Sequence, residues 1–240
     1  LGTPYSMLDD ILVLDYGSAG SLETIDAMRD KLAAVLVEPV QSRNPDLQPR
    51  DFLIKLRTLT AENGIALIFD EIITGFRIQT GGAQQYFQVK ADLVTYGKIL
   101  GGGLPIGVFA GTSDYMDRVD GGVWNYRDES SPSKFLAHTG GTFCHHPLSM
   151  AAAKAVLERL KRSGNDLNDM LNRRTKEMAQ FLNHFFQQNR IPLSVSYFSS
   201  LFIFQVQKHP DLLRFLYYML IEKGFYLWEG ATCFLSSEHT

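Results

Sequence analysis

Five short apolar runs in the first half of the chain constrain its fold more than any other feature. They are continuous rather than alternating, as expected of strands in a sheet that is covered on both faces. The predicted strands are ILVLDY (11–16), AAVLVEP (33–39), IALIFDE (65–71), ADLVTYG (91–97) and IGVFAG (106–111). The segment 49–64 between two of them has Pro near its start and Gly at its end, which predicts a helix. The pattern therefore predicts an α/β domain with a largely parallel sheet.

The pattern changes after about residue 145. Two long amphipathic segments predict helices, and they are followed by two further strand-like runs with a helix between them. In order, these elements are helix 146–164, helix 166–189, strand 193–206, helix 210–224 and strand 225–237. We therefore divide the chain into part of a large domain, residues 1–162, and most of a smaller α+β domain, residues 163–240.

Composition excludes several classes of function. The 240 residues are 45% hydrophobic and 20% charged, which is typical of a globular protein. A net charge of -3 does not suggest a nucleic-acid or anionic-membrane partner, and no apolar stretch approaches the roughly 18 residues of a membrane span. Two cysteines, Cys144 and Cys233, are too few for a disulfide framework and fit a reducing, cytoplasmic compartment. The absence of an initiator Met and the apolar run close to the last residue suggest a chain truncated at both ends.

Polar side chains stand at the ends of three predicted strands, namely Glu38 to Gln41, Asp70 with Glu71, and Lys98. In open α/β sheets, ligands bind beyond the carboxyl ends of the strands. Two adjacent carboxylates are costly to bury unless a positive charge meets at least one of them. Because side chains alternate along an extended chain, Asp70 and Glu71 point in different directions. We expect one to enter a pocket, together with the side chain of Ile72, and the other to turn toward a neighbouring loop or helix.

Lys98 lies in the segment VTYGKILGGGLPIG, where three consecutive glycines follow a lysine at a strand end. Glycines remove side chains where another group approaches the backbone closely or where a lysine must swing. A lysine that forms a Schiff base, together with an acid at a pyridinium nitrogen, is typical of pyridoxal phosphate enzymes. On this interpretation the protonated ring nitrogen is the cation that Asp70 meets. Such a pair is worth about 4 kcal/mol at about 4 Å and an effective dielectric constant of about 20.

Other interpretations of the same residues remain open at this point. A strand-end Asp-Glu pair is often a solvated turn or a helix cap, and a lone lysine is usually a surface charge. The segment GKILGGG lacks the complete G-x-x-x-x-G-K-[ST] arrangement of a nucleotide-binding P-loop. His138, Cys144, His145 and His146 include no C-x-x-C pair, so we predict no metal site.

Taken in order, several segments resemble the class III pyridoxal phosphate aminotransferases, and the resemblance runs over essentially the whole chain. They are LIFDEIITGFR, then YGKILGGGLPIG with Lys98 placed 28 positions after Asp70, and GGTFCHHPLSMAAA. The likeness is greatest to the glutamate-1-semialdehyde aminomutase-like branch. The segments AAVLVEPVQSRNPDLQP, GGAQQYF and FYLWEGATCFLSSEHT also resemble aminotransferase domains embedded in hybrid polyketide/nonribosomal-peptide synthases. The resemblance implies the fold-type I architecture, in which a three-layer α/β/α large domain with a mainly parallel sheet precedes a small α+β C-terminal domain.

The resemblance also implies a role for each of five residues around pyridoxal 5′-phosphate. Lys98 would hold the cofactor covalently and shuttle a proton, and Asp70 would pair with the pyridine nitrogen. Ile72 would press against one face of the ring, and Gln41 would hydrogen-bond its phenolic oxygen. Thr142 would reach the phosphate of the cofactor in the partner subunit, which implies a homodimer with shared active sites. The main phosphate-binding Gly-Ser loop and the ring-stacking aromatic of the family are expected upstream of the first residue.

The function predicted from this resemblance is transfer of an amino group from an amino-acid donor. The predicted acceptor is a β-ketoacyl thioester on a carrier protein, or a small keto acid, and the first would yield a β-amino acyl chain. One alternative is an aminomutase that moves an amine within one small molecule. Another is a non-catalytic dimerisation or docking module with the same fold, and we expect the 240-residue piece alone to be inactive.

Overall fold

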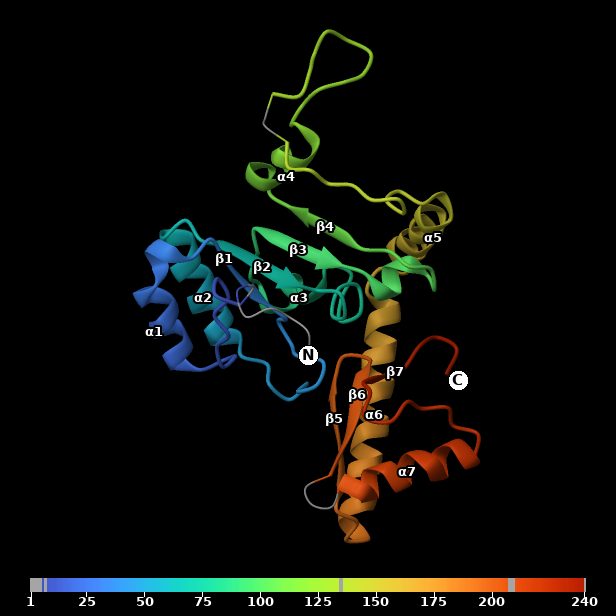
Figure 1. Ribbon diagram of the computed structural model, residues 1–240. Coiled ribbons are helices and arrows are strands. Elements are labelled where there is room, and N and C mark those ends of the chain that lie inside the picture. The colour runs from blue at the N-terminus through green and yellow to red at the C-terminus, as the bar shows by residue number, and fades with distance from the viewer. Residues whose placement is uncertain (1–5, 7, 134–135, 207–209, 240) are drawn as a thin grey trace.

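The computed structural model describes residues 6, 8–133, 136–206 and 210–239, which form two sheets with helices packed around them (Figure 1). The helices are α1 (Ala19–Ala27), α2 (Arg50–Glu62), α3 (Gly82–Phe87), α4 (Ser113–Asp120), α5 (Pro147–Ser163), α6 (Asp166–Gln188) and α7 (Pro210–Glu222), with short 3-10 helices at Arg29–Lys31 and Lys98–Gly101. The strands are β1 (Ala34–Val37), β2 (Ala66–Asp70), β3 (Leu93–Tyr96), β4 (Val108–Gly111), β5 (Leu193–Phe198), β6 (Leu201–Val206) and β7 (Cys233–Phe234).

The first sheet has the strand order β1-β2-β3-β4. The pairs β1–β2 and β2–β3 are parallel, and β4 joins the edge beside β3 in the antiparallel direction. The prediction of a mainly parallel sheet is therefore confirmed for the described residues. Because β1, β2 and β3 run in the same direction, the residues that follow them meet at one edge of the sheet.

The core of this part forms where α2 packs on β2. Leu53 and Leu56 of α2 and Leu67 and Phe69 of β2 are all completely buried. Burial of each such side chain contributes about 1.5–3 kcal/mol to folding. This packing fixes the position of β2, and with it the position of the residues that follow its last apolar side chain.

The predicted strand at 11–16 is wrong. These residues form no strand in the structure, and Val13 is 87% exposed. The segment is held instead at its end, where the Tyr16 hydroxyl donates to the carbonyl oxygen of Pro39 (2.8 Å) and the Tyr16 ring meets Phe52 edge-on. An apolar run becomes a strand only where a neighbouring strand offers hydrogen bonds, and β1 pairs only with β2 within the described chain.

The second sheet is antiparallel and has the order β5-β6-β7. The single strand predicted at 193–206 is a hairpin, because the chain reverses at Ser199, whose φ of 57° is left-handed, and Ser200. The strand predicted at 225–237 is reduced to Cys233–Phe234. Helices α6 and α7 pack against this sheet around a second apolar cluster that includes Ala179, Phe186, Val195, Phe202, Phe204 and Tyr217.

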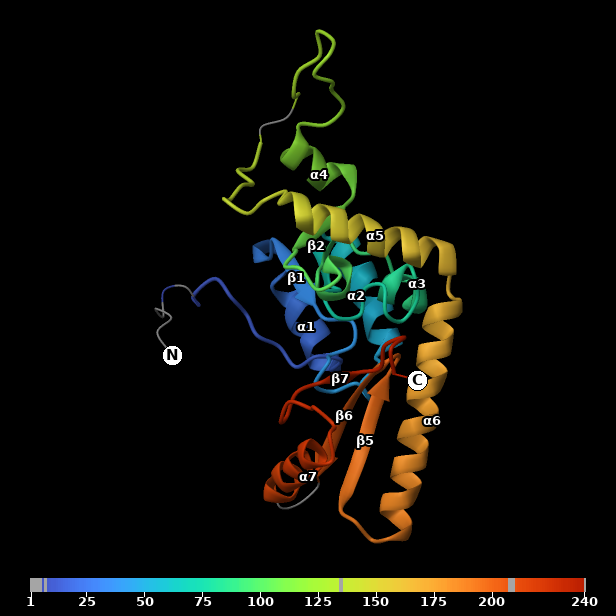
Figure 2. The ribbon, with the colours of Figure 1, turned by 90° about the vertical axis from the view of Figure 1, so that its right-hand side faces the viewer.

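The long helix α6 joins the two sheets, and Figure 2 shows it running from the end of α5 along β5. Three asparagines near its start bond the segment that follows β2. Asn165 accepts from the backbone and side chain of Thr80, whereas Asn168 and Asn172 donate to backbone carbonyls in residues 76–78. The predicted domain boundary at 162/163 coincides with the end of α5, and it stays a prediction.

Candidate functional site

Asp70 is the last residue of β2, and its carboxylate is oriented by the neighbouring backbone and strand. Its Oδ1 atom accepts a hydrogen bond from the Ile72 backbone N–H (3.0 Å) and one from the Thr95 hydroxyl (3.2 Å). Thr95 lies directly across from Asp70 in the parallel register of β2 and β3. The Oδ2 atom has no hydrogen-bond partner within the described part of the chain, so one oxygen remains to accept from a ligand.

Glu71 turns the other way, as the alternation of side chains predicts. It is only 1% exposed, and its carboxylate accepts from the backbone N–H groups of Ala83 (2.5 Å) and Gln84 (3.2 Å) and from the Thr74 hydroxyl (3.2 Å). Burial raises the pKa of this carboxyl, although the three hydrogen bonds oppose the shift. Glu71 therefore caps the start of α3 and leaves the strand-end site to Asp70.

Lys98 follows β3 and begins a short 3-10 helix. Its backbone has a φ of 45°, a left-handed conformation that is uncommon for residues other than glycine and recurs at functional sites. The side chain is exposed. Of the three glycines that follow, Gly102 allows α5 to approach, because a Cβ atom there would lie 3.0 Å from Cγ2 of Val156. The glycine run thus serves helix packing next to the lysine.

Ile72 lies beside the backbone that carries Lys98. Its Cγ2 atom is 3.5 Å from the position that a Cβ atom would take at Gly97, the residue immediately before the lysine. The end of β2 and the end of β3 therefore bring a carboxylate, an apolar side chain and an exposed amine to the same edge of the sheet. The structure thus gathers three of the five predicted site residues.

The loop after β1 places Gln41 near this edge. Glu38 orients the loop, because its Oε1 atom accepts from the Ser42 backbone N–H (3.1 Å). Burial raises the pKa of Glu38, the bond to Ser42 opposes the shift, and the charges of Asp70 and Lys98 act on it in opposite directions. These charges reach Glu38 because the three parallel strands end side by side. The Gln41 side chain itself makes no hydrogen bond with another described residue.

Thr142 makes no hydrogen bond with the residues of this cluster within the described chain. It is exposed in the segment between α4 and α5, and its side chain forms no hydrogen bond within the described ranges. The nearby Cys144 is likewise exposed and free. We find no group of three metal-binding side chains among the described residues. No described helix combines the length and apolar character needed to cross a bilayer.

The gathered residues fit pyridoxal phosphate. Oδ2 of Asp70 is available for a protonated ring nitrogen, since Oδ1 already holds its two donors. Asp70 forms no ion pair within 4.0 Å in the described structure, so the cation it is expected to meet is not a neighbouring side chain there. Ile72 offers an apolar surface for a ring and Lys98 an exposed amine.

Sequence reasoning missed two residues of this region. Thr95 orients Asp70, and the signal for it was a hydroxyl side chain three residues before Lys98 in a strand predicted to lie beside β2. Arg77 ends the segment LIFDEIITGFR, and its guanidinium lies over the ring of Phe234. The sequence carries no signal for this contact, because Phe234 lies 157 residues further along the chain.

The model of the family described as aminotransferase class-III matches residues 16–214. The chain is 31% identical over 253 residues to glutamate-1-semialdehyde 2,1-aminomutase of Archaeoglobus fulgidus, covering 100% of this chain and 57% of that protein. It is 33% identical over 258 residues to the enzyme of that name from Ruminiclostridium cellulolyticum, covering 100% of this chain and 56% of the relative. The chain thus spans a little over half the length of these relatives.

Solved structures give a consistent result. An omega-transaminase from Sphaerobacter thermophilus superposes with a TM-score of 0.83 at 29% identity, covering 98% of this chain and 54% of that one. A β-phenylalanine aminotransferase from Variovorax paradoxus gives a TM-score of 0.78 at 27% identity, covering 95% of this chain and 53% of that one. The predicted fold is confirmed over the part of it that this chain covers.

Proposed function

Since this chain belongs to the class-III aminotransferase family, whose cofactor is pyridoxal phosphate, we propose that the whole protein transfers amino groups with this cofactor held on Lys98. The observation that carries the proposal is that Asp70, Ile72 and Lys98 lie at the same ends of the neighbouring parallel strands β2 and β3. A family match alone is compatible with a fold that has lost its chemistry. An oriented carboxylate beside an exposed lysine favours a working site over a docking module.

Each residue has a defined role in this proposal. When bound, the cofactor supplies an electron-poor ring that stabilises negative charge on the substrate carbon next to the amine. Oδ2 of Asp70 holds the proton on the ring nitrogen, and Ile72 packs against the ring. Lys98 would hold the cofactor through Nζ, and the same amine would serve as the base that moves a proton at the substrate carbon. The Gln41 amide donates to the phenolic oxygen.

Among the substrate classes, we favour an aminomutase-type exchange within one small molecule. Its support is that relatives named glutamate-1-semialdehyde 2,1-aminomutase match the entire chain. Transfer from a separate amino-acid donor to a keto acid is the second candidate, favoured by the likeness to an omega-transaminase and to a β-phenylalanine aminotransferase. The acceptor predicted from the synthase-like segments, a β-ketoacyl chain on a carrier protein, receives no support from these relatives.

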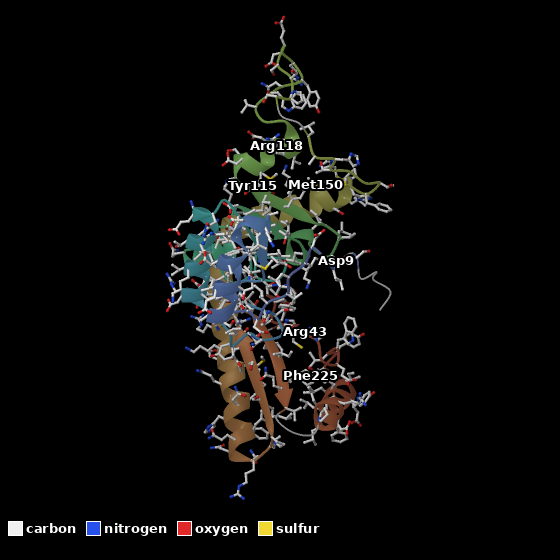
Figure 3. The ribbon with its side chains drawn as sticks, turned by 60° about the vertical axis from the view of Figure 1, so that its left-hand side comes forward. Asp9, Arg43, Tyr115, Arg118, Met150 and Phe225 are labelled. Atoms are coloured by element: carbon white, nitrogen blue, oxygen red, sulfur yellow. The ribbon has the colours of Figure 1, made fainter. Side chains whose placement is uncertain are left out.

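We also propose that the protein works as a homodimer in the cytoplasm. Support for the dimer comes from apolar side chains that are exposed on and beside the segment carrying Thr142. These are Val123 (99% exposed), Tyr126 (92%), Phe143 (82%) and Leu148 (65%). Figure 3 labels Tyr115 and Arg118 on α4 and Met150 at the start of α5, which mark this end of the molecule. Large apolar side chains that are exposed along one segment support an interaction surface there.

The proposal is tested by absorbance spectroscopy of the full-length protein with pyridoxal phosphate, before and after borohydride reduction. We expect a visible absorption band and, after reduction, a cofactor-modified peptide that contains Lys98. Lys98→Ala removes the attachment point, so it should abolish both signals. Lys90→Ala removes an exposed lysine outside the cluster and should leave both unchanged. If the folded wild-type protein showed no such band, the proposal would be contradicted and the non-catalytic docking module would be favoured.

Donor dependence then separates the two candidate reactions. An exchange within one molecule needs no external amino donor, because the amine removed from a substrate is returned to it. Turnover by the protein loaded with the pyridoxamine form of the cofactor, in the absence of any amino acid, is therefore expected for the aminomutase. Turnover that stops after one equivalent until an amino acid is added would favour the aminotransferase instead.

A further inference from the structure

The loop after β1, residues 41–49, is bonded to residues of the second sheet as well as to its own neighbours. The hydroxyl of Thr232, the residue immediately before β7, donates to the backbone carbonyl oxygen of Ser42 (3.1 Å). The hydroxyl of Ser196 in β5 donates to the carboxylate of Asp46. Because Thr232 lies 190 residues beyond Ser42, the first of these bonds ties the loop to a distant part of the chain.

Ser42 directly follows Gln41, and both of its backbone groups are hydrogen-bonded. Its N–H donates to Oε1 of Glu38 (3.1 Å), and its carbonyl oxygen accepts from Thr232 (3.1 Å). The carbonyl oxygen of Gln41 accepts from the backbone N–H of Asn44 (2.9 Å). Three bonds therefore hold the backbone at Gln41 and Ser42, and one of the three comes from the second sheet.

The position of the Gln41 side chain depends on this backbone. The side chain makes no hydrogen bond with another residue of the described ranges, and it is half-buried. Misplacement of an active-site group by about 1 Å is enough to cost activity. A residue that holds the backbone beside Gln41 therefore acts on the cofactor site without touching the cofactor.

We propose that Thr232 is a positioning residue of the cofactor site. Its hydroxyl holds the Ser42 carbonyl, and thereby keeps the Gln41 amide aimed at the phenolic oxygen of the cofactor. The inference rests on the function proposed above for Gln41. It adds that the second sheet, which carries none of the five predicted site residues, sets part of the geometry of the site. Thr232→Val keeps the branched shape of the side chain but removes the donor, which leaves the Ser42 carbonyl without this partner.

A pH titration of the visible absorption band tests this inference in the full-length protein with pyridoxal phosphate. A hydrogen bond donated to the phenolic oxygen favours the deprotonated form of the bound cofactor, so its weakening raises the midpoint of the titration. We expect Gln41→Ala to raise the midpoint by about one pH unit and Thr232→Val to raise it by about half a unit. Thr232→Ser keeps a hydroxyl and should restore the wild-type midpoint.

Thr58→Val is the matched control. It also removes a threonine hydroxyl that donates to a backbone carbonyl, that of Ile54 in α2 (3.2 Å), but the residue is exposed and outside the loop. This variant should leave the midpoint unchanged.

A double variant separates positioning from a general structural role. In the Gln41→Ala background, Thr232→Val should add no further shift, because its effect passes through the Gln41 amide. Amide hydrogen exchange of the cofactor-free protein gives a second readout that needs no cofactor. Thr232→Val should speed exchange in the peptide covering residues 41–48 and leave exchange in α2 unchanged.

Three results overturn the inference. They are an unchanged midpoint in folded Thr232→Val, a shift of equal size in the Gln41→Ala background, and unchanged exchange in residues 41–48. In each case a wild-type absorption band would leave the proposed function standing. Absence of the band from the folded wild-type protein would contradict the proposed function itself, and this inference with it. Where circular dichroism shows that Thr232→Val does not fold, Thr232→Ala removes the same hydroxyl and takes its place.

Discussion

Asp70 and its two hydrogen-bond donors make the sharpest prediction for a single residue. Asp70→Asn keeps an oxygen that can accept from the Ile72 N–H and the Thr95 hydroxyl, but it removes the charge. The lost attraction to a ring cation is about 4 kcal/mol at about 4 Å, which corresponds to roughly a thousandfold lower kcat/KM. Steady-state kinetics of the full-length variant measure this change.

The control for this substitution is Asp30→Asn, which neutralises an exposed carboxylate distant in sequence from the site. It should leave kcat/KM and the melting temperature nearly unchanged, because exposed single charges contribute little. The Asp70→Asn variant should also melt close to the wild-type temperature. Activity within about tenfold of wild type would contradict the pairing of Asp70 with the ring.

At the scale of a helix, α3 allows a prediction about stability, because the backbone N–H groups of its first turn donate to Glu71. Gly82 begins α3 with a φ of 65°, and a Cβ atom there would collide with the Glu71 carboxylate. Gly82→Ala should therefore lower the free energy of unfolding by more than the roughly 1–2 kcal/mol that a left-handed conformation costs a residue with a Cβ atom. Chemical denaturation of the full-length protein measures the loss.

Gly20→Ala is a matched control for this change. Gly20 lies in α1 with a right-handed backbone, and a Cβ atom there would meet nothing within 4 Å. Alanine in a helix is favoured over glycine by about 0.5–1 kcal/mol, so this variant should be slightly more stable than wild type. Equal stability of the two variants would contradict the close fit between Gly82 and Glu71.

The elements that sequence patterns predicted correctly are those whose periodicity reflects local packing. Helix α2 and strands β1 to β4 lie where apolar runs and helix-ending residues placed them. The run at 11–16 has the same composition as a strand, but strand formation depends on a partner that the local sequence does not contain. The hairpin at Ser199 was missed because serine is not a strong turn signal, and its left-handed backbone follows from the β5–β6 pairing.

The candidate site was predictable to the extent that it depends on strand ends. Asp70, Ile72 and Lys98 come together because two parallel strands end in register, which the apolar runs already indicated. The contact between Arg77 and Phe234 joins the segment after β2 to β7 of the second sheet, and no periodic pattern encodes such a distant pair. The role predicted for Thr142 likewise lies beyond one chain, because it would require a second subunit.

At the scale of the whole molecule, Thr142 is the residue that decides whether two subunits share each site. Thr142 is exposed, and no hydrogen bond joins it to Asp70 or Lys98 within the described structure. If it serves the cofactor phosphate of the partner subunit, each site takes Lys98 from one subunit and Thr142 from the other. Loss of its hydrogen bond to a charged group then weakens cofactor binding by about tenfold or more.

Intersubunit complementation tests this arrangement with heterodimers of the full-length protein, isolated through two different affinity tags. A Lys98→Ala subunit paired with a Thr142→Ala subunit has one site with both residues intact, so we expect about half the wild-type activity at limiting cofactor concentration. The reverse pairing, wild type with the Lys98→Ala/Thr142→Ala double variant, has no intact site and should be weakly active. If Thr142 instead served its own subunit, the two heterodimers would exchange these activities, because each site would then depend on one chain alone. The same pair of samples therefore distinguishes a shared site from a self-contained one.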